Sequence, residues 1–240
     1  MSEAFFWGLV GGSSLLIGAV LGVVLKQRMK VTGFVLAFGA GTLVSALTFE
    51  LTRDAYRIGG ADAVALGLAA GALAYFAGDR IVDRRGAERR MSFKGEQAAI
   101  PATALLFGAI LDGIPESAVI GLSLLGDPTV SVPVLAAVFI SNLPEGFASG
   151  TGMKKRGLLH VVGVWSLVVL ACAASSAAGY ALLDGASGNW VGGVQAFAAG
   201  AVLTMLVDTM FPEALEESGK VAGLVTVLGF ALAFLLSTVE

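Results

Sequence analysis

Two short motifs place carboxylates inside long apolar stretches of the chain. The segments DGIPES (112–117) and SNLPEG (141–146) share a Pro-Glu step followed by a small residue, and the apolar run around each contains no Lys or Arg. An ionised carboxylate is costly in hydrocarbon, and such residues are rare there unless they line a pathway or cavity. The negative charge must therefore be cancelled by protons or by a bound cation, or be hydrated within a cavity.

The spacing within each motif brings its polar side chains to one helix face. Asp112 and Glu116 are four residues apart. Ser141 and Glu145 repeat that spacing, and Asn142 precedes Glu145 by three residues. Residues at these separations are neighbours on the surface of a helix. The sequence therefore predicts two helices that each present a short row of oxygen ligands.

A short turn between the two motifs favours an antiparallel hairpin. In that register Glu116 lies level with Ser141. The same register places Asp112 level with Glu145. We therefore expect a mid-membrane cluster of oxygen ligands formed by Asp112, Glu116, Ser141, Asn142 and Glu145.

The prolines of the two motifs add to this hypothesis. Pro115 and Pro144 lack the N–H that would bond to the carbonyl four residues earlier, and each ring tends to kink its helix. Carbonyls freed at membrane depth are tolerated where they line a cavity or meet another partner. In the competing interpretation the prolines are only kinks and the glutamates are protonated packing residues. Two such steps in register on neighbouring helices favour the ligand site.

The elements that must position these residues are transmembrane helices. The chain of 240 residues is 56% hydrophobic and only 14% charged, too few charges for the surface of a soluble domain of this length. A helix needs about 20 apolar residues to cross a bilayer core. We therefore predict an all-α integral membrane protein, a single transmembrane domain over residues 1–240. Its eight expected spans are approximately 4–25, 31–51, 61–79, 99–126, 130–153, 157–183, 187–211 and 221–239.

The basic residues predict the orientation of this bundle. Of the fifteen Lys and Arg residues, only Arg53 and Arg57 fall on one side of the predicted membrane. Loops rich in Lys and Arg face the cytoplasm. Both termini are therefore expected outside, in a multi-pass protein of the cell (inner or cytoplasmic) membrane. The basic segment between the third and fourth spans is interpreted as this topology signal, and no nucleic-acid partner is expected.

At these residues the chain resembles the Zrt/Irt-like (ZIP) metal-ion transporters. Members carry motifs of the His-Asn-x-Pro-Glu-Gly type in their fourth and fifth spans, where DGIPES and SNLPEG stand here. LAFGAGTLVSALTFEL (36–51) resembles the second span of the family, and AFAAGAVLTMLVDTMFPEALEE (196–217) resembles the seventh. The resemblance implies an eight-helix ZIP-like bundle, transport of divalent metal ions and a homodimer.

By position, the resemblance implies metal ligands at Asp112, Gly113 and Glu116 in the fourth span and at Ser141, Asn142 and Glu145 in the fifth. Some of these positions are altered in this chain. Asp112 and Ser141 stand where the motif histidines are expected, and Gly113 replaces an asparagine. The family often has a glutamate in the sixth span, where this chain has no acid and Cys172 lies near the expected position. Oxygen ligands shift preference toward magnesium, manganese or calcium, although zinc also binds carboxylates. Cys172 is either a soft ligand or a buried apolar residue.

Three further acids are candidates for the ion pathway: Glu50, Asp208 and Glu213. They could form acidic vestibules that raise the local cation concentration at either face of the membrane. Alternatively, Glu50 and Asp208 are ordinary interfacial acids. Pro212, directly before Glu213, is interpreted as the end of the seventh helix.

The acidic cluster and the family resemblance together imply a secondary transporter for a divalent cation of the zinc, manganese or iron class, with cadmium as a further candidate. A degenerate family member that binds metal or a partner without transport is the alternative, because the motif histidines are missing. An enzyme is not expected, and no cofactor is implied. Two glycine pairs, Gly18 with Gly22 and Gly67 with Gly71, are predicted to pack helices closely inside the bundle.

Overall fold

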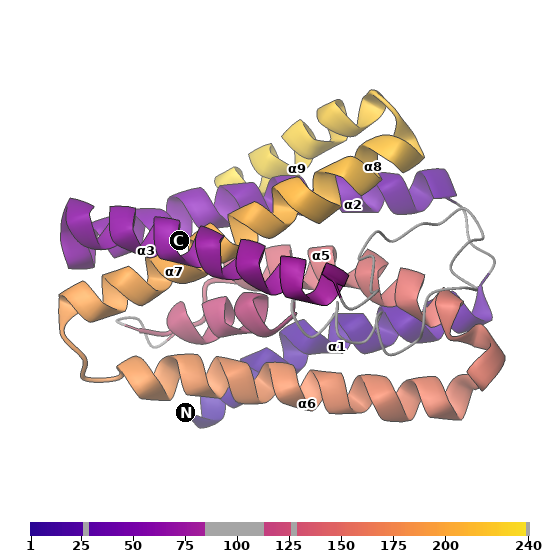
Figure 1. The fold of residues 1–240 in the computed structure, drawn as a ribbon, viewed down its shortest axis with the longest axis horizontal. Coiled ribbons are helices and arrows are strands. Elements are labelled where there is room, and N and C mark those ends of the chain that lie inside the picture. The colour runs from indigo at the N-terminus through magenta and orange to yellow at the C-terminus, as the bar shows by residue number, and fades with distance from the viewer. Residues whose placement is uncertain (26–28, 85–112, 126–128, 239–240) are drawn as a thin grey trace.

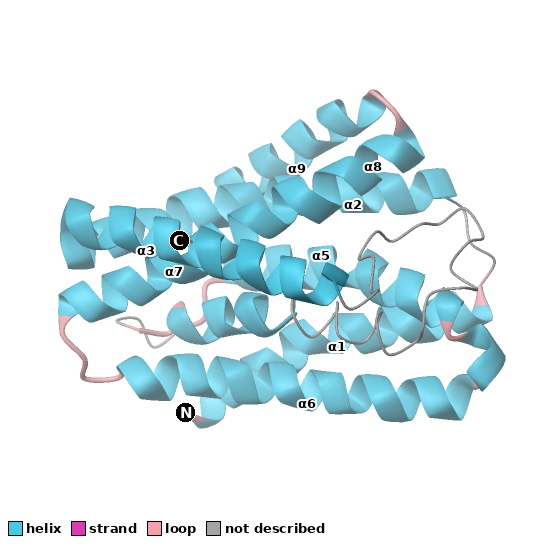
Figure 2. Cartoon of the chain, in the orientation of Figure 1, coloured by secondary structure: helices cyan, strands magenta, loops and turns pink. Residues whose placement is uncertain are grey.

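The computed structural model describes residues 1–25, 29–84, 113–125 and 129–238 (Figure 1). Within these residues every regular element is helical (Figure 2). Asp112 and the first part of the expected fourth span lie outside the described residues.

The helices follow one another along the chain as a bundle. Their bounds are α1 Ser2–Val24, α2 Met29–Ala46, the π-helix η1 Leu47–Thr52, α3 Arg53–Arg84, a helix over Gly113–Leu122, α5 Val132–Gly152, the short 3₁₀-helix η3 Lys154–Arg156, α6 Leu158–Leu183, α7 Gly188–Met205, the π-helix η4 Leu206–Met210, α8 Phe211–Ser218 and α9 Val221–Ser237.

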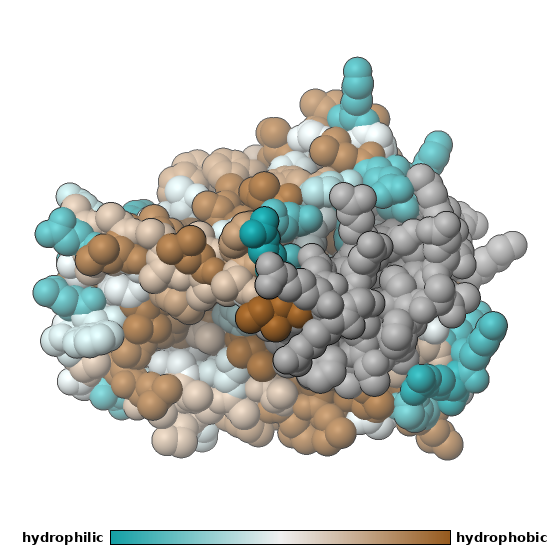
Figure 3. Space-filling view, in the orientation of Figure 1, coloured by the Kyte–Doolittle hydropathy of each residue, from teal (hydrophilic) through white to brown (hydrophobic). Residues whose placement is uncertain are grey.

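Five helical stretches in the described residues are long and apolar enough to cross a membrane, and two shorter apolar helices accompany them. Several large apolar side chains are largely exposed on the outer surface, such as Leu66 of α3 (73% exposed), Leu167 of α6 (68%) and Leu224 of α9 (70%). Figure 3 shows apolar side chains across the middle of the visible face and hydrophilic ones near its two ends. The chain is thus a multi-pass membrane protein; eight crossings and external termini remain predictions.

One of these stretches must contain two crossings. Residues 30–81 form 52 consecutive helical residues, which would extend roughly 78 Å at 1.5 Å per residue. A bilayer core is only about 30 Å thick. The backbone breaks at Gly60, whose φ of 76° and ψ of 178° suit glycine alone. The expected second and third spans lie on either side of this break.

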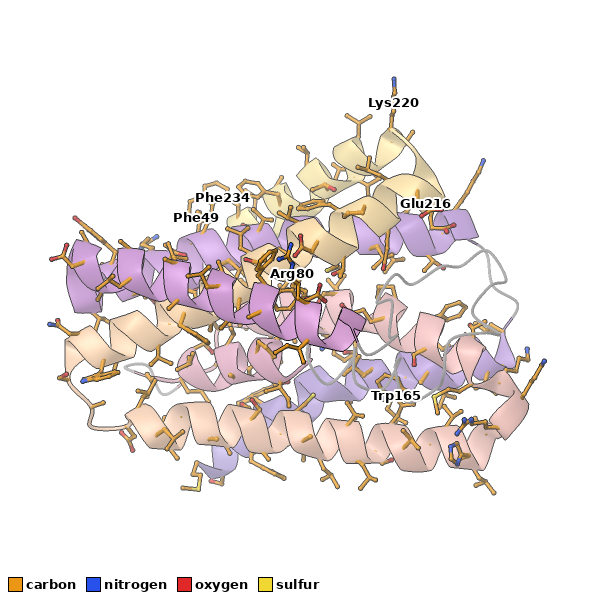
Figure 4. All side chains as sticks on the ribbon, in the orientation of Figure 1. Phe49, Arg80, Trp165, Glu216, Lys220 and Phe234 are labelled. Carbon is orange, nitrogen blue, oxygen red and sulfur yellow. The ribbon has the colours of Figure 1, made fainter. Side chains whose placement is uncertain are left out.

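The helices associate in two groups. In the α1 group, α1 packs against both α5 and α6, and the helix 113–122 contacts α1 and α6. In the α2 group, α2 packs against α8 and α9, while α3 packs against α7. Phe49 of η1 adds ring contacts with Phe230 and Phe234 of α9, at centroid distances of 6.0 and 4.9 Å (Figure 4). The two groups meet where α2 lies along α5.

Glycines allow the backbones within each group to touch. A Cβ added at Gly18 or Gly22 of α1 would collide with α5 carbonyl oxygens, and one added at Gly146 of α5 would collide with an α1 carbonyl. Gly67 and Gly71 of α3 meet carbonyls of α7 in the same way. The prediction that both glycine pairs pack helices inside the bundle is confirmed.

The predicted helix end at Pro212 is wrong. The chain stays helical through η4 and α8 as far as Ser218. A proline inside an α-helix disrupts the ladder because it cannot donate to the carbonyl four residues earlier. In η4 the hydrogen bonds span five residues instead of four, and Pro212 follows directly after this wider turn, so the regular ladder is already interrupted where the proline stands.

Candidate metal site

The centre of the α1 group holds a row of polar residues on α5. The helix starts at Ser131, whose hydroxyl accepts the Val134 N–H at 3.4 Å and caps it, and Pro133 falls in the first turn. Pro144 interrupts the hydrogen-bond ladder in mid-helix. The polar row therefore sits beside the point where the regular helix is weakest.

A hydrogen bond connects the two Pro-Glu helices. The Ser141 hydroxyl lies 3.2 Å from Glu116 Oε2 and 3.0 Å from the Val138 carbonyl oxygen. Glu116 is 1% exposed and Ser141 is wholly buried. The register predicted from the sequence, with Glu116 level with Ser141, is confirmed. The predicted pairing of Asp112 with Glu145 stays a prediction, because Asp112 lies outside the described residues.

Asn142 and Glu145 continue the row on α5. Asn142 is wholly buried and Glu145 is 5% exposed. The amide nitrogen and oxygen of Asn142 find no hydrogen-bond partner among the residues that the structure describes. Leaving a buried polar group unsatisfied costs about 1–3 kcal/mol. Buried polar groups are almost always hydrogen-bonded in folded proteins, so a water or an ion is expected to satisfy this amide.

Ser149 extends the row and was missed from the sequence. It lies four residues beyond Glu145, is buried, and its hydroxyl has no hydrogen-bond partner within the described part of the chain. The signal was present in the spacing, since residues four apart share a helix face. The hydroxyl of a serine in an apolar helix often donates a hydrogen bond to a backbone carbonyl one turn earlier. The spacing could therefore not by itself indicate a functional residue.

The sixth-span cysteine belongs to the same region. Cys172 of α6 is wholly buried, and its Sγ lies 3.7 Å from the Gly113 carbonyl oxygen. It also lies within electrostatic range of Glu116 and Glu145. The three helices that the resemblance assigns to the metal site thus bring their polar residues together.

Gly113 and Cys172 are complementary in size. A Cβ at position 113 would lie 3.2 Å from Cys172 Sγ and 3.4 Å from Leu15 Cδ1. The asparagine common at this position of the family motif would therefore press on the thiol. The two departures from the family pattern are physically linked.

This contact predicts a coupled effect on stability. Gly113→Asn should lower the apparent melting temperature of the purified protein in detergent, because overpacking a core costs about 1–3 kcal/mol. In a Cys172→Ala background the loss should be markedly smaller. Gly163→Asn on α6, where an added Cβ meets nothing within 4 Å, is the control. Equal losses in both backgrounds would contradict the contact.

The remaining candidates lie apart from these residues. Glu50 is in η1, Asp208 is exposed in η4, and Glu213 is buried in α8, all within the α2 group. His160 is exposed at the start of α6, as expected of an interfacial residue. Across the described ranges no three His, Cys, Asp or Glu side chains gather closely enough to hold an ion by themselves. A site here must also use hydroxyl, amide or carbonyl oxygens, or residues outside those ranges.

Comparison with known proteins finds a distant relative. The chain is 25% identical over 206 residues to an Arabidopsis thaliana protein named "Putative zinc transporter". The match covers 84% of this chain and 33% of the relative, so the chain spans about a third of that protein's length. No family model matches the chain. Neither result by itself shows a family for this chain.

Proposed function

We propose that this protein carries a divalent metal cation across a membrane through the buried polar cluster formed by the two Pro-Glu helices and α6. One observation carries the proposal: Glu116 and Ser141 are joined by a hydrogen bond across two helices at full burial. The apolar runs around these residues contain no Lys or Arg. A bound cation would balance the negative charge of such carboxylates at membrane depth.

The donor set suits a borderline or hard divalent ion. Glu116 and Glu145 supply carboxylate oxygens, Ser141 and Asn142 supply neutral oxygens, and Asp112 is proposed as a fifth ligand. Such oxygens bind manganese well and still accept zinc and iron(II). Cys172 would add one soft donor, which favours zinc and cadmium over magnesium. We therefore place the substrate in the zinc, manganese or iron class.

The proposed setting is that of a ZIP-like transporter. Eight crossings, external termini and location in the cell membrane follow from the charge distribution and the resemblance. The homodimer rests on the resemblance alone. The named relative supports a transporter rather than an enzyme.

A second candidate is a metal-binding protein that does not transport. It is favoured by the absence, within the described ranges, of three grouped His, Cys, Asp or Glu side chains. It is also favoured by the loss of both motif histidines. This candidate predicts that metal stabilises the protein and does not cross the membrane.

Uptake into liposomes separates the two candidates. The purified protein would be reconstituted, and entry of manganese, zinc, iron(II), cadmium and magnesium would be measured against protein-free liposomes. Uptake above that background supports transport, and the ranking of ions shows the selectivity of the oxygen-rich site. Folded protein that takes up none of the ions, yet is stabilised by one of them, supports the binding protein instead.

A further inference from the structure

The two helix groups meet along a seam formed by α2 with η1 on one side and α5 on the other. Two contacts fix its register: a Cβ added at Gly39 would lie 3.1 Å from Ser141 Cα, and Glu50 bonds to Ser131. The two helices therefore run antiparallel. Residues whose numbers sum to about 180 lie at the same level, so Glu50 and Ser131 mark one end and Thr32 and Ser149 mark the other.

One end of the seam is fastened by a side-chain hydrogen bond. The Ser131 hydroxyl donates to Glu50 Oε2 at 3.2 Å while accepting the Val134 N–H as the cap of α5. A hydroxyl can make both bonds at once, since it has one hydrogen and two lone pairs. Ser141 follows Ser131 by ten residues, about 15 Å along the helix axis. The bond therefore lies between this end of the bundle and the polar cluster.

The other end of the seam is hollow. A cavity of about 430 Å³ opens between α1, α2 and α5. Its lining includes Gly18, Leu21, Thr32, Val35, Pro144 and Phe147. The lining is almost wholly apolar, and it meets α5 at Pro144, one residue before Glu145, without including Glu145 itself.

Close packing within each helix group favours movement of that group as one unit. Gly22 of α1 and Gly146 of α5 bring those two backbones into contact, so α5 should move together with α1. Gly41 of α2 and Gly229 of α9 do the same within the α2 group. The seam carries a close approach of its own, at Gly39 and Ser141, and in addition the Glu50–Ser131 bond, a directional contact that can be made and broken.

Glu50 also stands on an unusual piece of backbone. It lies within the π-helix η1, and such turns are uncommon and often occur at functional sites. A π-turn contains one residue more than an α-turn, and one residue corresponds to about 100° of rotation in an α-helix. A change of η1 to regular α-helix would turn Glu50 away from Ser131.

We propose that the Glu50–Ser131 hydrogen bond is a latch that closes one end of the α2–α5 seam while the cavity opens the other. Releasing the latch exposes the polar row of α5 to the Glu50 side. The gating role rests on the proposed transport function. The closure itself is tested without any metal ion.

Accessibility of an engineered thiol tests the latch. In a Cys172→Ala chain, which has no other cysteine, Val138→Cys places a reporter between Ser131 and Ser141, at a position only 1% exposed. Sealed vesicles of both orientations would be treated with a membrane-impermeant thiol reagent. With the latch intact, labelling from the Glu50 side should be slow.

Variants of the two partners should then change the labelling rate. Glu50→Ala removes the acceptor, and Ser131→Asp keeps an N-capping side chain while setting two carboxylates against each other. Each is expected to raise the rate from the Glu50 side at least about tenfold, the effect of losing about 1.4 kcal/mol of closure. Glu50→Gln combined with Ser131→Asp should return the rate toward that of the parent, because the amide can donate to the new carboxylate.

Thr48→Ala is the matched control, since Thr48 is exposed in the same π-helix and its hydroxyl donates to the Val44 carbonyl four residues earlier. Thr42→Cys, at the facing level of α2, is a second reporter should Val138→Cys fold poorly. An unchanged rate in both Glu50→Ala and Ser131→Asp would overturn the latch, whatever the liposomes take up. Raised labelling in these variants, with no ion uptake by the parent protein, would support the latch and contradict the proposed transport function.

Discussion

Glu116→Gln and Glu145→Gln are each expected to reduce metal uptake into liposomes by about tenfold to a hundredfold. The amide keeps the size of the side chain and removes its negative charge. Interactions with charged groups contribute about 1.5–3 kcal/mol, and every 1.4 kcal/mol is a factor of ten. The loss should appear for every transported ion. Both carboxylates belong to the same buried cluster, and every divalent ion that binds there needs their negative charge.

The measurement is the initial rate of uptake at equal amounts of folded, reconstituted protein. Glu3→Gln is the matched control, since Glu3 is an exposed acid in the first turn of α1. Unchanged rates in both buried variants would show that the Pro-Glu carboxylates do not carry the ion. The glutamates would then be packing residues, the alternative already apparent in the sequence.

Asn142→Leu should move stability and transport in opposite directions. The asparagine side chain is wholly buried, and its amide finds no partner among the described residues. Replacement by an apolar group of similar size removes a penalty of about 1–3 kcal/mol. Without metal, the apparent melting temperature in detergent should therefore rise by several degrees. Uptake should fall at least about tenfold, because the site loses a neutral oxygen ligand.

Gln195→Leu on α7 is the control for this prediction. Gln195 is also buried with an unpartnered amide oxygen within the described residues, but it lies in the α2 group, outside the cluster. Its replacement should leave uptake within about twofold. Added metal should stabilise the parent and the Gln195 variant but stabilise Asn142→Leu less. A lower melting temperature for Asn142→Leu in the absence of metal would show that the amide is satisfied in the protein.

The relation between Glu116 and Ser141 illustrates what local pattern could predict. Each Pro-Glu motif fixes its own side chains through helix periodicity, and the short turn between them limits the register. The hydrogen bond of 3.2 Å between Ser141 and Glu116 joins the two residues that this register places at the same level. Apolar runs and their lengths likewise indicated membrane helices, since hydrocarbon accepts a backbone only when its polar groups are satisfied internally.

Contacts between distant helices could not be predicted in this way. The fit of Gly113 against Cys172 joins residues of two helices that are far apart in the chain. The Glu50–Ser131 bond likewise joins η1 to α5 across the seam. Pro212 shows a further limit, because a shift to π-helix upstream let the helix continue where a proline usually ends it. None of these depends on a periodicity that a single segment displays.

The sequence alone determined the membrane class, the position of the buried carboxylates and the pairing of the two Pro-Glu helices, because hydrophobicity and helix spacing are local properties. Only the tertiary structure decided which helices form each group, where glycines let backbones touch, and how the α2–α5 seam is closed at one end and hollow at the other. These features depend on the shapes of surfaces that meet across long separations in the chain, and close packing makes each of them sensitive to single atoms.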